Sequence, residues 1–100
     1  MNIVINEKNG SYYGKLTGWI DTAVATQFLE DLKPLMNNSS KYIELDCEQL
    51  EYICSLGLRG LLKLKKESAS KGGKLLLINV KGEFLKILTM TGFLKLFDIS

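Results

Sequence analysis

The chain has 100 residues, of which 46% are hydrophobic and 24% are charged, with a single proline; this composition excludes a disordered or fibrous protein. The 13 basic and 11 acidic residues give a net charge of +2 and are mixed along the chain. A chain of this length is expected to form one globular domain over residues 1–100. Because nucleic-acid-binding domains gather positive charge on one face, we expect that this domain binds no nucleic acid directly.

The first elements are predicted to be the two strands of a β-hairpin. Polar and apolar residues alternate over residues 2–7, and a second extended run covers residues 12–16. Between them, Asn9-Gly10 is a strong signal for a tight turn. Gly18 is expected to close the second strand.

The next stretch predicts a helix and a third strand. Asp21 or Thr22 is expected to cap the helix, and Pro34 to distort or finish its last turn. A polar loop over residues 37–40 then leads to a short central strand over residues 42–46. The helix is predicted from apolar residues at helical spacing, namely Val24, Phe28, Leu32, Leu35 and Met36.

The second half of the chain predicts two more helices around one buried strand. A loop over residues 47–54 leads to a helix over residues 56–69, which has an apolar stripe along one side. Glycines end this helix, and a continuous apolar run over residues 74–78 predicts a buried strand. A last helix begins near Gly82 and ends at Gly92, after which an apolar tail folds back.

The order of these elements determines the expected fold. Strands that alternate with helices pair in parallel through right-handed crossovers, and the hairpin adds an antiparallel edge. We therefore predict an α/β fold with a mixed four-stranded β-sheet, an N-terminal β-hairpin and about three helices packed against the sheet.

Residue types that usually carry catalysis are scarce. The chain has no histidine, and it has no glycine-rich loop of the phosphate-binding or dinucleotide-binding type. Asp21 and Asp46 could in principle form a carboxylate pair, but helix capping and solvation are commoner fates of lone aspartates. Cys47 and Cys54 do not form a CxxC pair, so we expect two reduced, partly buried thiols. No catalytic residue, metal site or cofactor is predicted.

Signals for secretion and for membrane insertion are also missing. Residues 1–5 are followed at once by polar and charged residues, which is unlike a signal peptide. No stretch approaches the roughly 20 apolar residues that a membrane-spanning helix needs. We therefore expect a cytoplasmic location without membrane insertion.

Ser55 lies at the predicted start of the second helix and is the sharpest signal in the chain. One interpretation is structural, because a serine at this place commonly accepts a hydrogen bond from a free N–H of the first turn. The other is regulatory, because the same N–H groups and the positive end of the helix dipole favour a phosphate. Phosphorylation would add about −1.5 to −2 charges and would alter binding with little effect on the fold.

Five short motifs then follow one another in a specific order. They are Gly18-Trp19-Ile20-Asp21-Thr22, Ile43-Glu44-Leu45-Asp46, Ile53-Cys54-Ser55-Leu56-Gly57-Leu58-Arg59, Lys71-Gly72-Gly73-Lys74-Leu75 and Thr91-Gly92-Phe93. Each motif alone is weak, but together they resemble the STAS domain family, which is named from sulfate transporters and anti-sigma factor antagonists. The resemblance spans nearly the whole chain and points to the antagonist type.

The resemblance implies regulation of bacterial transcription by partner switching. In the family's antagonists, the unphosphorylated domain binds an anti-sigma factor that is also a serine kinase, and the sigma factor is released. Phosphorylation of one serine, which Ser55 matches, ends the interaction, and a serine phosphatase restores it. The expected partner-binding residues are Asp21, Thr22, Cys54, Leu56, Gly57 and Arg59. Gly57 is expected to let another backbone come close, and the oligomeric state stays open between a monomer and a weak dimer.

Two residues depart from the family pattern and keep two alternatives open. Cys54 stands where antagonists usually have aspartate or serine, and Leu56 stands where a small residue is common. If Leu56 forms a permanent docking surface, the protein is a STAS interaction subunit of a membrane lipid-transport complex that is never phosphorylated. If Cys54, just before a helix, is a nucleophile, the protein is a thiol enzyme.

Overall fold

The computed structural model describes residues 2–100 and begins with the predicted hairpin. Strand β1 (Ile3–Lys8) pairs antiparallel with strand β2 (Ser11–Ile20). The turn between them needs a left-handed backbone, which Asn9 and Gly10 adopt with φ angles of 53° and 83°. The hairpin prediction is therefore confirmed.

In the described part of the chain, the sheet has five strands, not the four that were predicted. Strands β3 (Tyr42–Ile53), β4 (Lys74–Ile78) and β5 (Asp98–Ile99) follow β2 in order, and each is parallel to its neighbour. The unpredicted strand β5 has only two residues. Such a short strand has no periodic pattern in the sequence, and it forms because the tail of the chain returns to the edge of β4.

Strand β3 has 12 residues, and the loop predicted over residues 47–54 is therefore wrong. The pairing of β3 with β2 shifts register twice, and each shift places extra β3 residues opposite β2. The buried residues in this part, Cys47, Leu50 and Ile53, are therefore three positions apart and not two. This spacing hides the second half of β3 from a search for alternating residues. The prediction that Gly18 closes β2 is also wrong, because Trp19 and Ile20 still pair with Tyr52 and Ile53.

Over the residues that the structure describes, the chain forms four α-helices rather than about three, because the predicted first helix is divided in two. Pro34 has no N–H to continue the hydrogen bonds of the first piece, and a short second piece begins beside it. The predicted helix over residues 56–69 is confirmed within one residue at each end. The helices are α1 (Thr22–Asp31), α2 (Lys33–Met36), α3 (Ser55–Ser70) and α4 (Gly82–Thr91), and a 3-10 helix η1 (Phe93–Leu96) follows α4.

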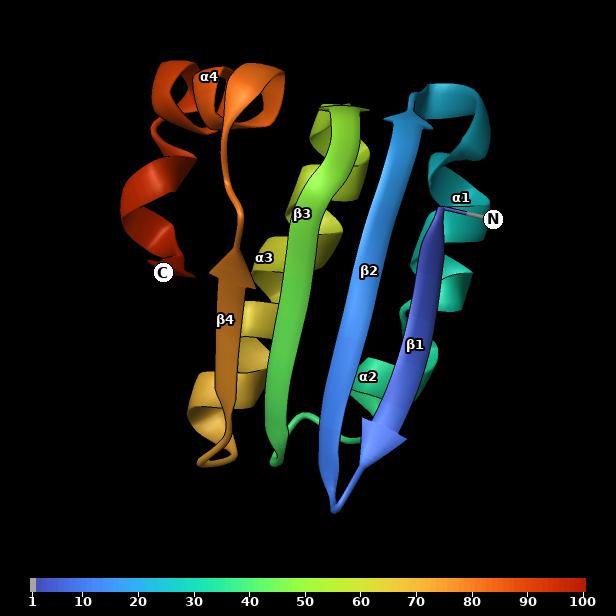
Figure 1. The fold of residues 1–100 in the computed structure, drawn as a ribbon, viewed down its shortest axis with the longest axis vertical. Helices are drawn as coiled ribbons and strands as arrows, with labels where there is room; N and C mark the ends of the chain where they lie inside the picture. Colours follow the sequence, from blue (N-terminus) through green and yellow to red (C-terminus); the bar gives the residue numbers. More distant parts are fainter. Residues whose placement is uncertain (1) are drawn as a thin grey trace.

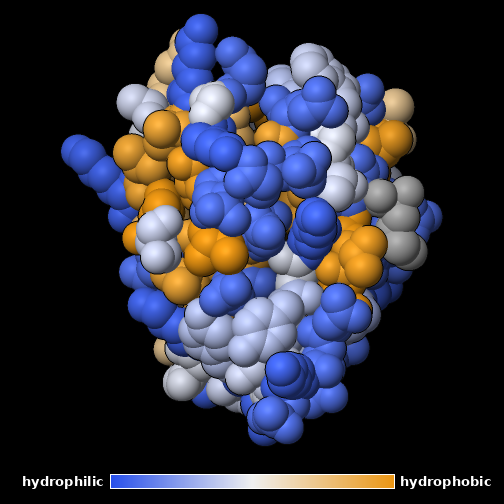
Figure 2. Space-filling view, in the orientation of Figure 1, coloured by the Kyte–Doolittle hydropathy of each residue, from blue (hydrophilic) through white to orange (hydrophobic). Residues whose placement is uncertain are grey.

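The helices are arranged mainly as one layer on the sheet. Figure 1 shows α1, α2 and α3 behind one face of the sheet and α4 above the upper end of β4. The opposite face carries no helix of residues 2–100, and Figure 2 shows that it is mostly hydrophilic with scattered apolar patches. The core lies between the layers and includes Leu16, Phe28, Leu35, Ile43, Leu45, Leu61, Leu64, Leu75, Leu77 and Phe84. Within residues 2–100, every helix is too short or too polar to span a membrane.

Candidate functional site

The starts of α1 and α3 lie side by side at one end of the sheet. Helix α1 begins directly after β2, and α3 begins directly after β3. The two junctions are joined by a hydrogen bond in which the backbone N–H of Cys54 donates to the carbonyl oxygen of Ile20 at 2.8 Å. The fold therefore brings the Asp21 region and the Ser55 region, which are far apart in the sequence, to one place.

Ser55 is exposed and is the first residue of α3. The N-cap of this helix is Cys54, whose backbone is extended, so the interpretation of Ser55 as the capping residue is wrong by one position. The side chain of Cys54 makes no capping hydrogen bond. The N–H groups of the first turn of α3 therefore remain able to bind an anion, and the Ser55 hydroxyl faces solvent.

Of the two residues expected to cap the first helix, Asp21 has this role. Its side-chain Oδ1 accepts a hydrogen bond from the backbone N–H of Val24 at 3.2 Å, at the start of α1. Thr22 is the first residue of α1 and is exposed. Asp21 is half-buried, so its carboxylate also forms part of the surface next to the start of α3.

The carboxylate pair of Asp21 and Asp46 does not form. Asp46 lies opposite Lys15 in the sheet, seven residues before the end of β3, whereas Asp21 follows the end of β2. The amide of Asn79 donates to Asp46 at 2.9 Å and the backbone N–H of Glu48 donates at 3.0 Å. These two hydrogen bonds lower the pKa of Asp46, which keeps it a charged structural group.

The two helix starts give different expectations for alanine substitutions. Asp21→Ala should destabilise the protein by about 1 kcal/mol, because it removes the capping bond of α1. Ser55→Ala should change stability by less than about 0.5 kcal/mol, because the hydroxyl caps nothing. Urea denaturation of both variants measures the difference, and an equal loss in the two would contradict the assignment of Cys54 as the N-cap.

Gly57 is buried and serves the packing of α3 on its own sheet. A Cβ atom at this position would lie 2.9 Å from Cγ1 of Ile53 and 3.4 Å from Cγ2 of Ile20. The missing side chain therefore lets the first turn of α3 sit directly on the ends of β2 and β3.

Ser55 lies on the wall of a shallow hollow between the start of α3 and the end of α4. This Ser55 hollow has a volume of about 330 Å³. Arg59 is the one cation among its lining residues, four positions after Ser55 on the same helix. The hollow is lined by Tyr52, Ile53, Ser55, Leu58, Arg59, Ile87, Thr91 and Phe93.

Several of these lining residues were not among the predicted site residues. Ile87, Thr91 and Phe93 reach the site only because α4 and η1 pack beside the start of α3, which the sequence order does not reveal. The motif Thr91-Gly92-Phe93 was the available signal. Tyr52 was missed because it belongs to the part of β3 that was predicted as a loop. Its ring stacks on that of Trp19 with centroids 4.6 Å apart, and Trp19 is 58% exposed.

Both cysteines are free and buried, which leaves little access for chemistry. Burial, followed by the charge of Asp46, raises the pKa of the Cys47 thiol to about 12. Cys54 is 8% exposed at the N-cap of α3. Among residues 2–100, no three metal-ligating side chains are grouped as a metal ion would require.

We expect both thiols to label slowly in the folded protein. At pH 8 a thiol whose pKa is about 12 has a thiolate fraction about 1,000 times smaller than an ordinary cysteine, so Cys47 should be nearly inert. Rates with a chromogenic disulfide, compared between native protein and protein in urea, measure this effect. In the variant Cys47→Ala, Cys54 is the remaining thiol, so the labelling rate is that of Cys54. Fast labelling of this variant in its folded state would contradict the view that Cys54 is only a packed side chain.

Comparison with known proteins decides the family. The model of the STAS domain family matches residues 2–100 of the chain. The chain belongs to the STAS domain family. Its fold is thus that of STAS proteins, as the motifs indicated.

Similar proteins of this family are anti-sigma factor antagonists. BtrV of Bordetella bronchiseptica, assigned as an anti-sigma factor antagonist, is 27% identical over 100 residues, which cover 100% of this chain and 86% of BtrV. The crystal structure of an anti-sigma factor antagonist from Mycobacterium paratuberculosis is 18% identical, with a TM-score of 0.82 over 97% of this chain and 82% of that chain. The Bacillus cell fate determinant SpoIIAA in its phosphorylated form is 16% identical, with a TM-score of 0.72 over 98% of this chain and 90% of that chain.

Proposed function

We propose that this protein is a cytoplasmic anti-sigma factor antagonist that is switched by phosphorylation of Ser55. In the unmodified state it binds an anti-sigma factor that is also a serine kinase, so that the sigma factor is released. The kinase phosphorylates Ser55 and ends the interaction, and a serine phosphatase restores it. The protein acts by binding and carries out no catalysis.

The exposed Ser55 hydroxyl at the first position of α3 is the observation that carries this proposal. A kinase must reach the hydroxyl, and a buried serine could not be modified. The first-turn N–H groups and the helix dipole tolerate the phosphate, so the folded state persists after modification. The likeness to antagonists, one of them a protein with a known phosphorylated form, supports the same role.

Arg59 suggests how the added phosphate changes the surface. It lines the same hollow as Ser55, one helical turn further along α3, and makes no ion pair within residues 2–100. A phosphate on Ser55 would add negative charge and would also attract this guanidinium. The partner would then meet an anionic surface where the unmodified protein offers a hydroxyl and a cation.

The six expected partner-binding residues divide into two groups. Thr22, Leu56 and Arg59 are exposed, and Asp21 is half-buried, so these four can contact a partner directly. Cys54 and Gly57 are buried. In this proposal they hold the start of α3 in place, and they do so from within the domain.

Leu56 favours one second candidate function. Its side chain is 38% exposed directly beside Ser55, which suits a permanent apolar contact. In that case the protein is the STAS subunit of a membrane lipid-transport complex and is never phosphorylated. The two candidates differ in whether Ser55 is a kinase substrate.

A phosphorylation assay separates them. The purified protein is incubated with ATP and the anti-sigma factor kinase of the same bacterium, and intact mass is measured. The wild-type chain and the matched control Ser40→Ala should each gain one phosphoryl group, and Ser55→Ala should gain none. A wild-type chain that stays unmodified, while the kinase phosphorylates a known substrate, would favour the permanent docking subunit.

A further inference from the structure

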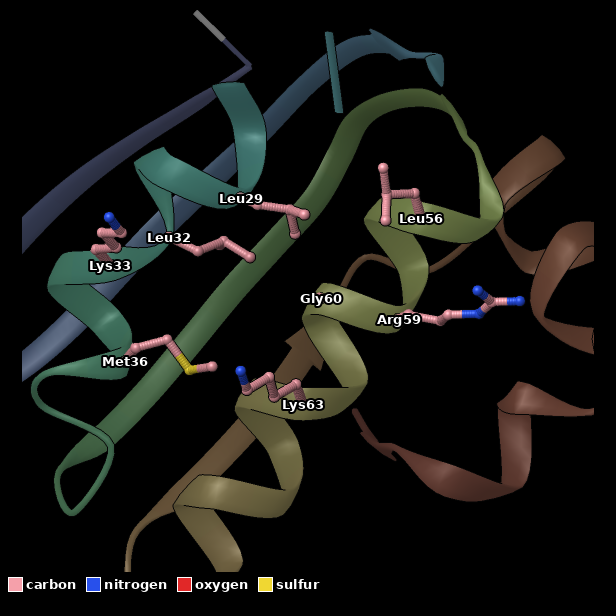
Figure 3. Close-up of a pocket in the computed structure, with 8 residues that line it drawn as sticks. All are labelled: Leu29, Leu32, Lys33, Met36, Leu56, Arg59, Gly60 and Lys63. Atoms are coloured by element: carbon pink, nitrogen blue, oxygen red, sulfur yellow. The ribbon is translucent and has the colours of Figure 1, made fainter. Parts of the chain in front are cut away.

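A second hollow lies on the other side of Leu56, between α3 and the pair α1 and α2. This groove, here called the α1–α3 groove, has a volume of about 460 Å³. Figure 3 shows Leu29, Leu32 and Met36 directed toward α3. It is lined by Leu29, Leu32, Lys33, Met36, Leu56, Arg59, Gly60 and Lys63.

The groove exists because α1 and α3 touch at a residue without a side chain. A Cβ atom at Gly60 would lie 2.2 Å from Cδ2 of Leu29. The Leu29 side chain therefore occupies the space that a side chain at position 60 would need. Two helices in contact leave a furrow on their solvent side, and the ridges of a third helix fit into such a furrow. The shape therefore suits a helix laid along it.

The chemistry of the lining defines which helix would fit. The floor is apolar, and Met36 contributes a flexible side chain that adapts to different partners. The charged lining residues are all cations, and no carboxylate is among them. Lys63 extends toward Met36 in Figure 3 and has no ion pair within residues 2–100. Lys33 pairs with Glu30 at 2.7 Å, but both side chains are largely exposed, so this pair is weak and easily exchanged.

Leu56 connects the groove to the proposed switch. Its side chain lines the groove, whereas that of Ser55, the preceding residue, lines the hollow beside α4. The guanidinium of Arg59 is directed away from the groove and toward α4 (Figure 3). One partner could therefore occupy both places, with only the Ser55 side sensing the phosphate directly.

We propose that the α1–α3 groove binds an amphipathic, acidic helix of the protein whose binding Ser55 controls. The identity of that partner rests on the proposed function. Apolar residues of the helix, spaced at i, i+3 or i+4 and i+7, lie on the leucine and methionine floor. Aspartate or glutamate residues on its flanks face Lys33 and Lys63. The groove supplies affinity in both states of Ser55, and the serine decides whether the rest of the interface can close.

The test uses a designed peptide probe and the full chain. The probe is a 15-residue helical peptide with capped ends. It has leucine at positions i, i+4 and i+7, which face the floor of the groove, and glutamates on both flanks of that apolar face. It is titrated into isotope-labelled, unmodified protein and followed by NMR. Amide shift changes should cluster at Leu29, Met36, Leu56 and Lys63. The same peptide with lysine in place of glutamate should bind at least about tenfold more weakly.

Charge-reversed variants show whether the groove itself binds the peptide. The double variant Lys33→Glu, Lys63→Glu should bind the acidic peptide at least about tenfold more weakly and should prefer the lysine peptide. Lys8→Glu reverses one charge in the hairpin, outside the groove, and should stay within about twofold of wild type. All variants should keep the wild-type pattern of dispersed amide signals, because the three lysines are exposed.

Four outcomes would overturn the proposal. The acidic peptide could leave the groove residues unshifted, or both peptides could bind equally. Decanoate, titrated in parallel, could shift the groove residues while the peptide does not, which would make the groove a site for a small anionic amphiphile. The groove signals could shift with protein concentration alone, which would assign the groove to a second copy of the chain.

The peptide titration contains no kinase, so its result is independent of the phosphorylation assay. Peptide binding without phosphorylation of Ser55 supports the groove and removes only the switch. Phosphorylation without peptide binding removes only the groove.

Discussion

A phosphate on Ser55 is expected to weaken partner binding about 100-fold, which corresponds to about 2.7 kcal/mol. The hydroxyl is exposed at the start of α3, so the modified group would lie in the contact area without disturbing the core. A partner surface shaped for a neutral hydroxyl would have to bury about −1.5 to −2 charges, and a charge buried without its counterion is costly. Isothermal titration of phosphorylated and unphosphorylated protein with the anti-sigma factor measures the change.

Two substitutions make this expectation specific to the position. Ser55→Asp adds one negative charge and should weaken binding about tenfold, while its unfolding free energy stays within about 0.5 kcal/mol because helix starts favour acidic residues. Ser40→Asp makes the same change in the exposed loop before β3, at the opposite end of that strand from Ser55. It should leave binding unchanged. If Ser55→Asp binds like the wild type, the charge mechanism is wrong.

Gly73→Ala is expected to destabilise the fold by about 3 kcal/mol and to lower Tm by about 15 °C. A Cβ atom at this position would lie 2.1 Å from the carbonyl oxygen of Ser39 and 2.8 Å from that of Lys41. Both atoms belong to backbone just before β3, which cannot rotate away as a side chain could. The register Tyr42↔Lys74 holds this backbone beside the start of β4, so relief of the clash would disturb the sheet.

The neighbouring glycine provides the matched control. Gly72 has a φ of 76° and no atom within 4 Å of the place where a Cβ would lie. Asparagine adopts such left-handed backbone readily, so Gly72→Asn should cost less than about 1 kcal/mol. Thermal unfolding of both variants, followed by circular dichroism, makes the comparison. Equal stability losses in the two would show that the close backbone contact at Gly73 does not limit the fold.

The segment around Ser55 shows how far the sequence predicted the candidate site. The helix start, the capping role of Asp21 and the exposed serine follow from local residue preferences, which need only a few neighbouring residues. The exact N-cap differed by one residue because the hydrogen bond from Cys54 to Ile20 holds Cys54 in an extended backbone just after the end of β3. Gly57 also packs against Ile53 and Ile20 of the same chain, a contact between distant residues that the sequence did not indicate, and its contact with a partner's backbone stays a prediction.

The sequence by itself determined the α/β class, the hairpin, the long helix α3 and the family, because periodic apolar residues and short motifs are local properties. Only the tertiary structure decided the second half of β3, the strand β5 and the division of the first helix. It also decided the two hollows on either side of Leu56. The physical reason is that bulged pairing, edge pairing and grooves between helices depend on contacts between residues far apart in the chain, and no short window of sequence contains both partners of such a contact.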